Sequence, residues 1–127
     1  MSKTIISTDN APAAIGPYSQ AVRTGNTLYI SGQLPLDPAT KEMPEDAAAQ
    51  ASRSMQNIRA ILEAAGCTMD SIVRCGIFVT DLGDFAAINE AYAAFFTGDY
   101  PARATVQVAA LPLGAKVEID AIAIVEE

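Results

Sequence analysis

The C-terminal segment, residues 116–125, constrains the fold most, because the strand that it predicts requires burial on both faces. Side chains alternate between the two faces of a strand. One face carries Val117, Ile119, Ala121, Ala123 and Val125, and the other passes from Lys116, Glu118 and Asp120 to Ile122 and Ile124. A chain of 127 residues cannot cover both faces of a sheet by itself. We therefore predict a homo-oligomer that assembles through the sheet, although Ile122 and Ile124 are also compatible with scattered surface apolar residues.

Two other segments follow a helical period. Residues 46–65 place apolar side chains at steps of three and four. The acidic pair Glu45-Asp46 suits the helix start, and Gly66 suits its C-terminus. A second helix is predicted from Asp84 onward, with its apolar stripe ending at Phe95 and with Gly98 beyond its end.

The remaining patterns predict about six strands. They lie at residues 3–7, 21–24, 27–32, 72–79, 104–109 and 116–125, and residues 33–38 form a proline-containing loop. The element order predicts one α+β domain over residues 1–127, a mixed sheet with two helices packed on one face. The turn pair Gly25-Asn26 predicts a hairpin between the second and third strands.

Composition excludes several classes of protein. Half of the residues are hydrophobic and the mean hydropathy is +0.21, which excludes a disordered chain, while the apolar stretches fall short of the ~20 residues that cross a bilayer. The net charge of −7 argues against nucleic acid as a partner. The first residues lack the pattern of a secretory or import signal, so we expect a cytoplasmic protein.

The chain contains no histidine, and its two cysteines are eight positions apart. This removes an imidazole base, and it makes a zinc site or a disulfide framework improbable. The sequence also lacks the glycine-rich phosphate-binding motifs.

A small set of polar residues remains as candidates for chemistry. Arg103, at the start of a predicted strand, offers a planar fork for a carboxylate or phosphate. A solvated arginine is the alternative.

Glu118 lies on the strand face that we expect another subunit to cover. Desolvation there would raise the pKa of its carboxyl and suit it to activate a water, and a surface carboxylate paired with Lys116 is the alternative. If the last two strands form a direct hairpin, Glu118 pairs near Val108, roughly 17 Å from Arg103 within one chain. The two residues would then cooperate only across a subunit boundary.

Two short motifs could present polar groups to a small ligand. The rigid Gly-Pro turn at residues 16–17 could direct Tyr18 outward, and Ser31 and Gly32, at a strand end, offer a hydroxyl and a backbone N–H. Each motif alone is weak.

Taken together, these segments resemble the RidA/YjgF family of reactive-intermediate deaminases. The similar segments are AAIGPYSQA at residues 13–21, LYISGQ at 28–33, NEAY at 89–92, the phenylalanine pair at 95–96, YPAR at 100–103 and KVEI at 116–119. They extend over nearly the whole chain in the family's order. The resemblance implies a chorismate-mutase-like α+β protomer, a homotrimer with clefts between subunits, and hydrolysis of 2-imino acids such as 2-iminobutanoate and 2-iminopropanoate to 2-oxo acids and ammonia.

The resemblance also implies roles for individual residues. Arg103 matches the arginine that clamps the substrate carboxylate, and Glu118 matches the residue that places the attacking water. The cleft would be lined by Tyr18, Ser31, Gly32 and Asn89. Thr105, on the same face as Arg103, stands where many family members have cysteine. An imine is already electrophilic, so a clamp and an oriented water suffice, and we expect neither a metal nor a cofactor.

Other functions stay open at this point. The same cleft could belong to a non-catalytic module that binds a 2-oxo acid or an amino acid, an option that Thr105 keeps open. Ribonuclease activity has been attached to the family, but the negative charge and the missing histidines argue against it. A holdase-type chaperone would use the apolar composition, and no motif favours it.

Overall fold

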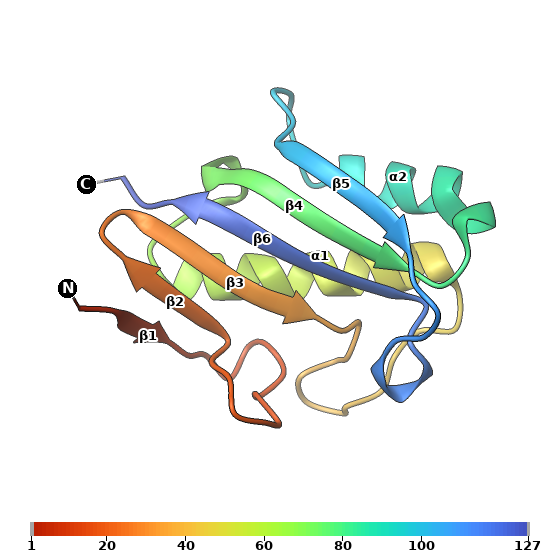
Figure 1. Cartoon of the computed structure of the whole chain (residues 1–127), viewed down its shortest axis with the longest axis horizontal. Helices are drawn as coiled ribbons and strands as arrows, with labels where there is room; N and C mark the ends of the chain where they lie inside the picture. Colours follow the sequence, from red (N-terminus) through yellow and green to blue (C-terminus); the bar gives the residue numbers. More distant parts are fainter. Residues whose placement is uncertain (1, 127) are drawn as a thin grey trace.

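Two α-helices lie on the same face of a six-stranded mixed sheet in the computed structural model, which describes residues 2–126 (Figure 1). The strands are β1 (Thr4–Ile6), β2 (Ala21–Thr24), β3 (Thr27–Gln33), β4 (Ile72–Val79), β5 (Ala102–Gln107) and β6 (Val117–Ile124). The helices are α1 (Ala47–Ala64) and α2 (Phe85–Ala93), and the strand order is β1-β2-β3-β6-β4-β5. The predicted α+β architecture is confirmed. No helix within these residues is long and apolar enough to cross a membrane.

Helix α1 forms where the period predicted it. The Asp46 carboxylate accepts a hydrogen bond from the backbone N–H of Ala49 at 2.6 Å, which caps the first turn. Gly66 follows the helix with a φ of 78°, a left-handed conformation that glycine adopts without strain. Met55, Ile58 and Leu62 of the predicted apolar stripe are completely buried in the core.

The predicted hairpin and the predicted second helix also form, and they differ from the prediction only in where the elements end. The hairpin of β2 and β3 turns at Gly25 and Asn26, with Thr24 opposite Thr27. Helix α2 ends at Ala93, so Phe95 lies in the turn that follows rather than on the helical stripe.

The last two strands do not form the direct hairpin that would have placed Glu118 near Val108. Strand β5 pairs with β4 in parallel, and β6 lies between β3 and β4, antiparallel to both. Glu118 consequently lies opposite Phe78 on β4 and not near Val108, whose N–H donates to the carbonyl of Val79. The physical reason is the crossover through α2. This helix carries the chain back to the end of the sheet at which β4 began, so that β5 runs in the same direction as β4.

Strand β6 shows the predicted alternation of its two faces. The side chains of Val117, Ile119, Ala121 and Ala123 are buried on the face that α1 covers, whereas Glu118 and Asp120 are half-buried on the other. No helix within residues 2–126 covers that other face (Figure 1). It presents Tyr29 and Ile124, which are 50% and 38% exposed. This uncovered face is a surface that a partner could cover.

Buried carboxamide side chains tie the long loops to this framework. Asn57 on α1 is completely buried, and its Nδ2 donates to the carbonyls of Leu34 and Leu36 at 3.1 and 3.0 Å. Gln50, about two helical turns earlier, donates to the carbonyl of Pro44 and accepts from the N–H of Lys116. These bonds satisfy loop groups that would otherwise be buried without partners.

Replacing Asn57 with alanine should lower the free energy of unfolding by about 2–3 kcal/mol, because the carbonyls of Leu34 and Leu36 lose their donor. Urea unfolding at a fixed protein concentration measures the change. Gln56→Ala, at the neighbouring and only half-buried position, is the control and should cost about 0.5 kcal/mol or less. Equal losses in the two variants would show that the carboxamide bonds of Asn57 do not hold this loop.

Candidate functional site

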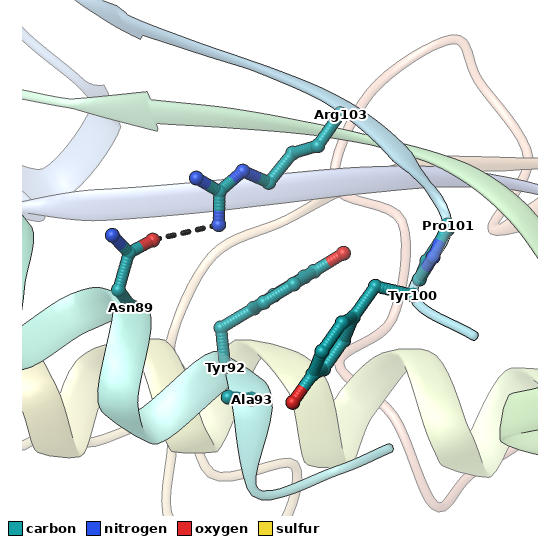
Figure 2. Close-up of a pocket in the computed structure, with 6 residues that line it drawn as sticks. All are labelled: Asn89, Tyr92, Ala93, Tyr100, Pro101 and Arg103. Atoms are coloured by element: carbon teal, nitrogen blue, oxygen red, sulfur yellow. Dashed lines mark hydrogen bonds between the residues drawn. The ribbon is translucent and has the colours of Figure 1, made fainter. Parts of the chain in front are cut away.

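Arg103 lies on the edge strand β5 and points toward α2 (Figure 2). Its register partner on β4 is the buried Cys75, which is in turn opposite Ala121, so all three residues share the helix-covered face of the sheet. The Arg103 guanidinium therefore lies against α2 at the β5 edge of the sheet.

Three residues of α2 surround the guanidinium. Nη1 of Arg103 donates to Oδ1 of Asn89 at 2.7 Å. The guanidinium carbon lies 5.6 Å from the centre of the Phe85 ring and 5.2 Å from that of Tyr92, within the range of cation–π attraction. We call these four residues the Arg103 cluster. The bond and the two rings fix the orientation of the fork, which remains exposed to solvent.

A hollow opens on each side of the guanidinium. The first, of about 470 Å³, is lined by Leu82, Phe85, Arg103 and Thr105. The second, of about 400 Å³, is lined by Asn89, Tyr92, Ala93, Tyr100, Pro101 and Arg103 (Figure 2). Arg103 is common to both, so its charge can meet a ligand that enters either one.

Thr105 lies two residues after Arg103 and shares its face of β5, as the alternation predicted. Its Oγ1 is buried and has no hydrogen-bond partner within residues 2–126. The hydroxyl is thus a donor and acceptor without a protein partner next to the arginine.

Cys75 and Tyr92 lie beneath the guanidinium. Burial raises the pKa of the Cys75 thiol to about 11. Burial also raises the pKa of the Tyr92 phenol, with the neighbouring Cys75 as the second cause. The Tyr92 hydroxyl makes no hydrogen bond within the part of the chain that the structure describes. Both groups therefore stay protonated near neutral pH, and Cys75 is a weak nucleophile.

Glu118 lines a third hollow, on the opposite face of the sheet. This hollow has a volume of about 400 Å³. Its lining comes from Pro12, Ala13, Ile15, Tyr18, Gln20, Ser31, Gly32, Gln33, Leu34, Leu36, Pro112 and Glu118. Burial raises the pKa of the Glu118 carboxyl above its ordinary value, and the negative charge of Asp120 adds to this effect. The sequence predicts that desolvation raises the pKa of Glu118, and the structure gives a raised pKa with burial as its main cause.

Buried Gln20 holds the loop that carries Tyr18. Its Oε1 accepts from the N–H of Thr8 at 2.7 Å, and its Nε2 donates to the carbonyls of Thr8 and Pro12 at 3.0 and 2.8 Å. Tyr18 itself is 50% exposed, and Ser31 Oγ donates to the carbonyl of Ser19 at 2.6 Å. These bonds order one wall of the Glu118 hollow.

The structure thus divides the predicted site residues into two groups. Asn89, Arg103 and Thr105 lie together on the helix-covered face, at the β5 edge. The other group, Tyr18, Ser31, Gly32 and Glu118, lies together on the uncovered face. The sheet separates the two groups within one protomer. No cluster of metal-ligating side chains is present in residues 2–126.

Sequence reasoning missed the aromatic members of the Arg103 cluster as site residues. Phe85, Asn89 and Tyr92 are spaced at i, i+4 and i+7, so they share one face of α2. That spacing was available in the sequence, but only the strand register shows that this face meets Arg103.

Replacing Cys67 with serine leaves Cys75 as the only thiol, and we expect that thiol to resist alkylation in the folded protein. With a pKa of about 11, roughly one Cys75 in a thousand is a thiolate at about pH 8. Iodoacetamide should therefore react about 100-fold more slowly in buffer than in concentrated urea. Equal rates in the two solvents would contradict the burial of this residue beneath Arg103.

Comparison with known proteins gives full-length matches. The family model described as Endoribonuclease L-PSP matches residues 8–125. Protein DfrA of Myxococcus xanthus is 59% identical over 98% of this chain and 97% of its own, and a 2-iminobutanoate/2-iminopropanoate deaminase of Escherichia coli is 54% identical over 98% of each chain. The structure of E. coli TdcF with bound serine superposes with a TM-score of 0.94 at 48% identity, covering 97% of this chain and 99% of the other.

Proposed function

Because the chain belongs to the RidA/YjgF family, whose model is described as Endoribonuclease L-PSP, we propose that it is a deaminase that hydrolyses 2-imino acids to 2-oxo acids and ammonia. The observation that carries the proposal is the full-length similarity to a protein named 2-iminobutanoate/2-iminopropanoate deaminase. The Arg103 cluster and the Glu118 hollow supply chemistry that suits this reaction.

Arg103 is the proposed clamp for the substrate carboxylate. Asn89 occupies one N–H of the fork, and no other hydrogen bond engages the guanidinium within residues 2–126. The remaining N–H groups can donate to the two oxygens of a carboxylate, which is the geometry that arginine favours. The serine bound in the TdcF structure supports a ligand with an amino-acid carboxylate on this fold.

Glu118 is the proposed base that activates water. In the proposed reaction, the water oxygen attacks the imine carbon while Glu118 accepts a proton. Attack on the protonated imine gives a neutral carbinolamine, and Glu118 returns its proton to the amino nitrogen. The C–N bond then breaks to release ammonia while the hydroxyl proton passes back to Glu118 and on to solvent, which leaves a 2-oxo acid. Because the imine carbon is already electrophilic, orientation and proton transfer suffice, and we expect no cofactor.

We further propose that Arg103 and Glu118 meet between subunits of a homotrimer. Within one protomer they face opposite sides of the sheet, so a substrate that touches both requires two chains. Asn89 and Thr105 would then come with Arg103 from one subunit, whereas Tyr18, Ser31 and Gly32 would come with Glu118 from the next. The apolar side chains on the uncovered face suit such an interface.

A non-catalytic binding module is the alternative, and the serine in the TdcF structure is the observation that favours it. Such a module would bind 2-oxobutanoate saturably and would not accelerate ammonia release from imino acids. An assay in which the imino acid is generated in place separates the two functions.

Arg103→Ala should reduce kcat/KM for 2-iminobutanoate by about 100-fold or more, because the substrate carboxylate loses its clamp. Ammonia release above the uncatalysed rate measures this effect. Arg103→Lys keeps the charge without the fork and should give an intermediate rate.

Arg59→Ala is the matched control. Arg59 also lies over an aromatic ring, that of Phe95 at 5.3 Å, but it lines neither of the hollows beside Arg103. Its removal should leave kcat/KM within about twofold of the parent. A fully active Arg103→Ala protein would exclude the carboxylate clamp.

A further inference from the structure

Two carboxylates on β6 lie opposite glycines of the neighbouring strands. Glu118 and Asp120 share the uncovered face of β6. A Cβ placed on Gly32 of β3 would come within 2.7 Å of Oε2 of Glu118, and a Cβ placed on Gly76 of β4 would come within 2.5 Å of Oδ1 of Asp120. Both distances are shorter than real Cβ contacts allow. We call these two places the Gly32 notch and the Gly76 notch.

The notches lie on opposite sides of β6, because β3 and β4 are its two neighbours. Glu118 therefore turns toward β3, and Asp120 turns toward β4. Like charges repel, and two residues two positions apart on one strand face are only about 7 Å apart. The two glycines allow the carboxylates to diverge.

The two carboxylates differ in how they are held. Oδ1 of Asp120 accepts a hydrogen bond from the backbone N–H of Gly76 at 2.9 Å, so its position on the sheet is fixed. Glu118 accepts no hydrogen bond within residues 2–126, although its carboxylate is half-buried in the hollow that Tyr18 and Ser31 also line. A carboxylate with unused acceptor positions can bind and deprotonate a water.

We propose that Asp120 is a positioning residue for the Glu118 base: anchored by Gly76, it holds a fixed negative charge that turns Glu118 into the Gly32 notch and strengthens it as a proton acceptor. This inference rests on the proposed function in one respect, the role of Glu118 toward water. The electrostatic coupling between the two carboxylates is independent of that role.

Other charged or titratable groups near this face do not take the place of Asp120. Lys116, directly before β6, donates through Nζ to the carbonyl of Glu45, and Arg74 on β4 lies opposite Ile122, further along β6 than Asp120. The other titratable side chains near this face are those of Tyr18, from the loop before β2, and Tyr29 on β3, and neither is a carboxylate. The charge of Asp120 is also a cause of the raised pKa of Glu118, second to burial. In the proposed trimer, Arg103 of a second subunit faces Glu118 in the parent and in every variant below. Differences in the pKa of Glu118 between these proteins therefore report the effect of Asp120.

Asp120→Asn tests the inference, because the asparagine Oδ1 can still accept from the Gly76 N–H while the charge is lost. The pKa of Glu118 should fall, since the negative charge that opposed its ionisation is gone. Carboxyl ¹³C NMR of glutamate-labelled, full-length protein measures this pKa directly, and Glu118→Gln identifies the resonance.

The acid limb of kcat/KM should move to lower pH by the same amount. Below the midpoint of the parent's limb, the variant should be about two- to fivefold faster than the parent, and above it somewhat slower because the base is weaker. Comparison with the parent on one substrate cancels the titration of the imine itself. A merely structural role for Asp120 would lower the rate at every pH.

Asp70→Asn is the control for the loss of one charge. Asp70 is exposed and precedes β4, whereas Glu118 lies opposite Phe78, about 20 Å further along that strand. This variant should leave both the pKa of Glu118 and the acid limb unchanged. Asp120→Ser, whose hydroxyl can also accept from Gly76, gives the same readouts as Asp120→Asn if the asparagine variant folds poorly.

The two readouts distinguish failure of this inference from failure of the proposed function. An unchanged Glu118 pKa in Asp120→Asn overturns the inference, whatever the activity. A lowered pKa with an unmoved acid limb supports the coupling between the carboxylates but removes Glu118 as the base of the reaction.

Discussion

The insertion of β6 between β3 and β4 is the constraint on which the rest of the structure depends. It places one face of β6 against α1, where Val117, Ile119 and Ala121 are buried, and leaves the other face without cover. The same insertion gives Glu118 a glycine neighbour on β3 and Asp120 a glycine neighbour on β4. It also moves Arg103 two strands away from Glu118, onto the edge strand and the opposite face.

The arrangement around each proposed functional group serves to fix it before a ligand arrives. Asn89, Phe85 and Tyr92 orient the Arg103 fork from α2, and a bond to Asn89 leaves the rest of the fork open. On the other face, the carboxamide of Gln20 orders the loop that presents Tyr18. Preorganisation of this kind reduces the entropy lost when a small substrate is bound in a reactive geometry.

Much of this fold could be predicted from the sequence, and the part that could not depends on long-range pairing. The helical period of residues 46–65, the Gly25-Asn26 turn and the alternation on β6 are local patterns, and each was found where it was expected. The short connection through Leu113 left a direct hairpin of the last two strands as one possible pairing, and the structure does not contain it. The strand, helix and strand at residues 72–107 instead favour a parallel neighbour, a signal that is only visible when the three elements are considered as one unit. The sequence likewise identified Arg103 and Glu118 as candidate site residues. That they lie on opposite faces of the sheet depends on the long-range strand register, which local patterns do not contain.

The central claim, that Arg103 of one subunit and Glu118 of another act on one substrate, is tested most directly by mixing two inactive variants. Arg103→Ala and Glu118→Gln chains are refolded together in equal amounts, and imine deamination is compared with that of each variant alone. In a closed ring whose sites take one residue from each of two neighbours, about one quarter of the sites regain both residues. The account therefore predicts about a quarter of the parent activity in the co-refolded mixture, and no gain over the separate variants when the two are combined after separate assembly. A co-refolded mixture no more active than the separate variants would contradict it, because both residues would then have to act from the same chain.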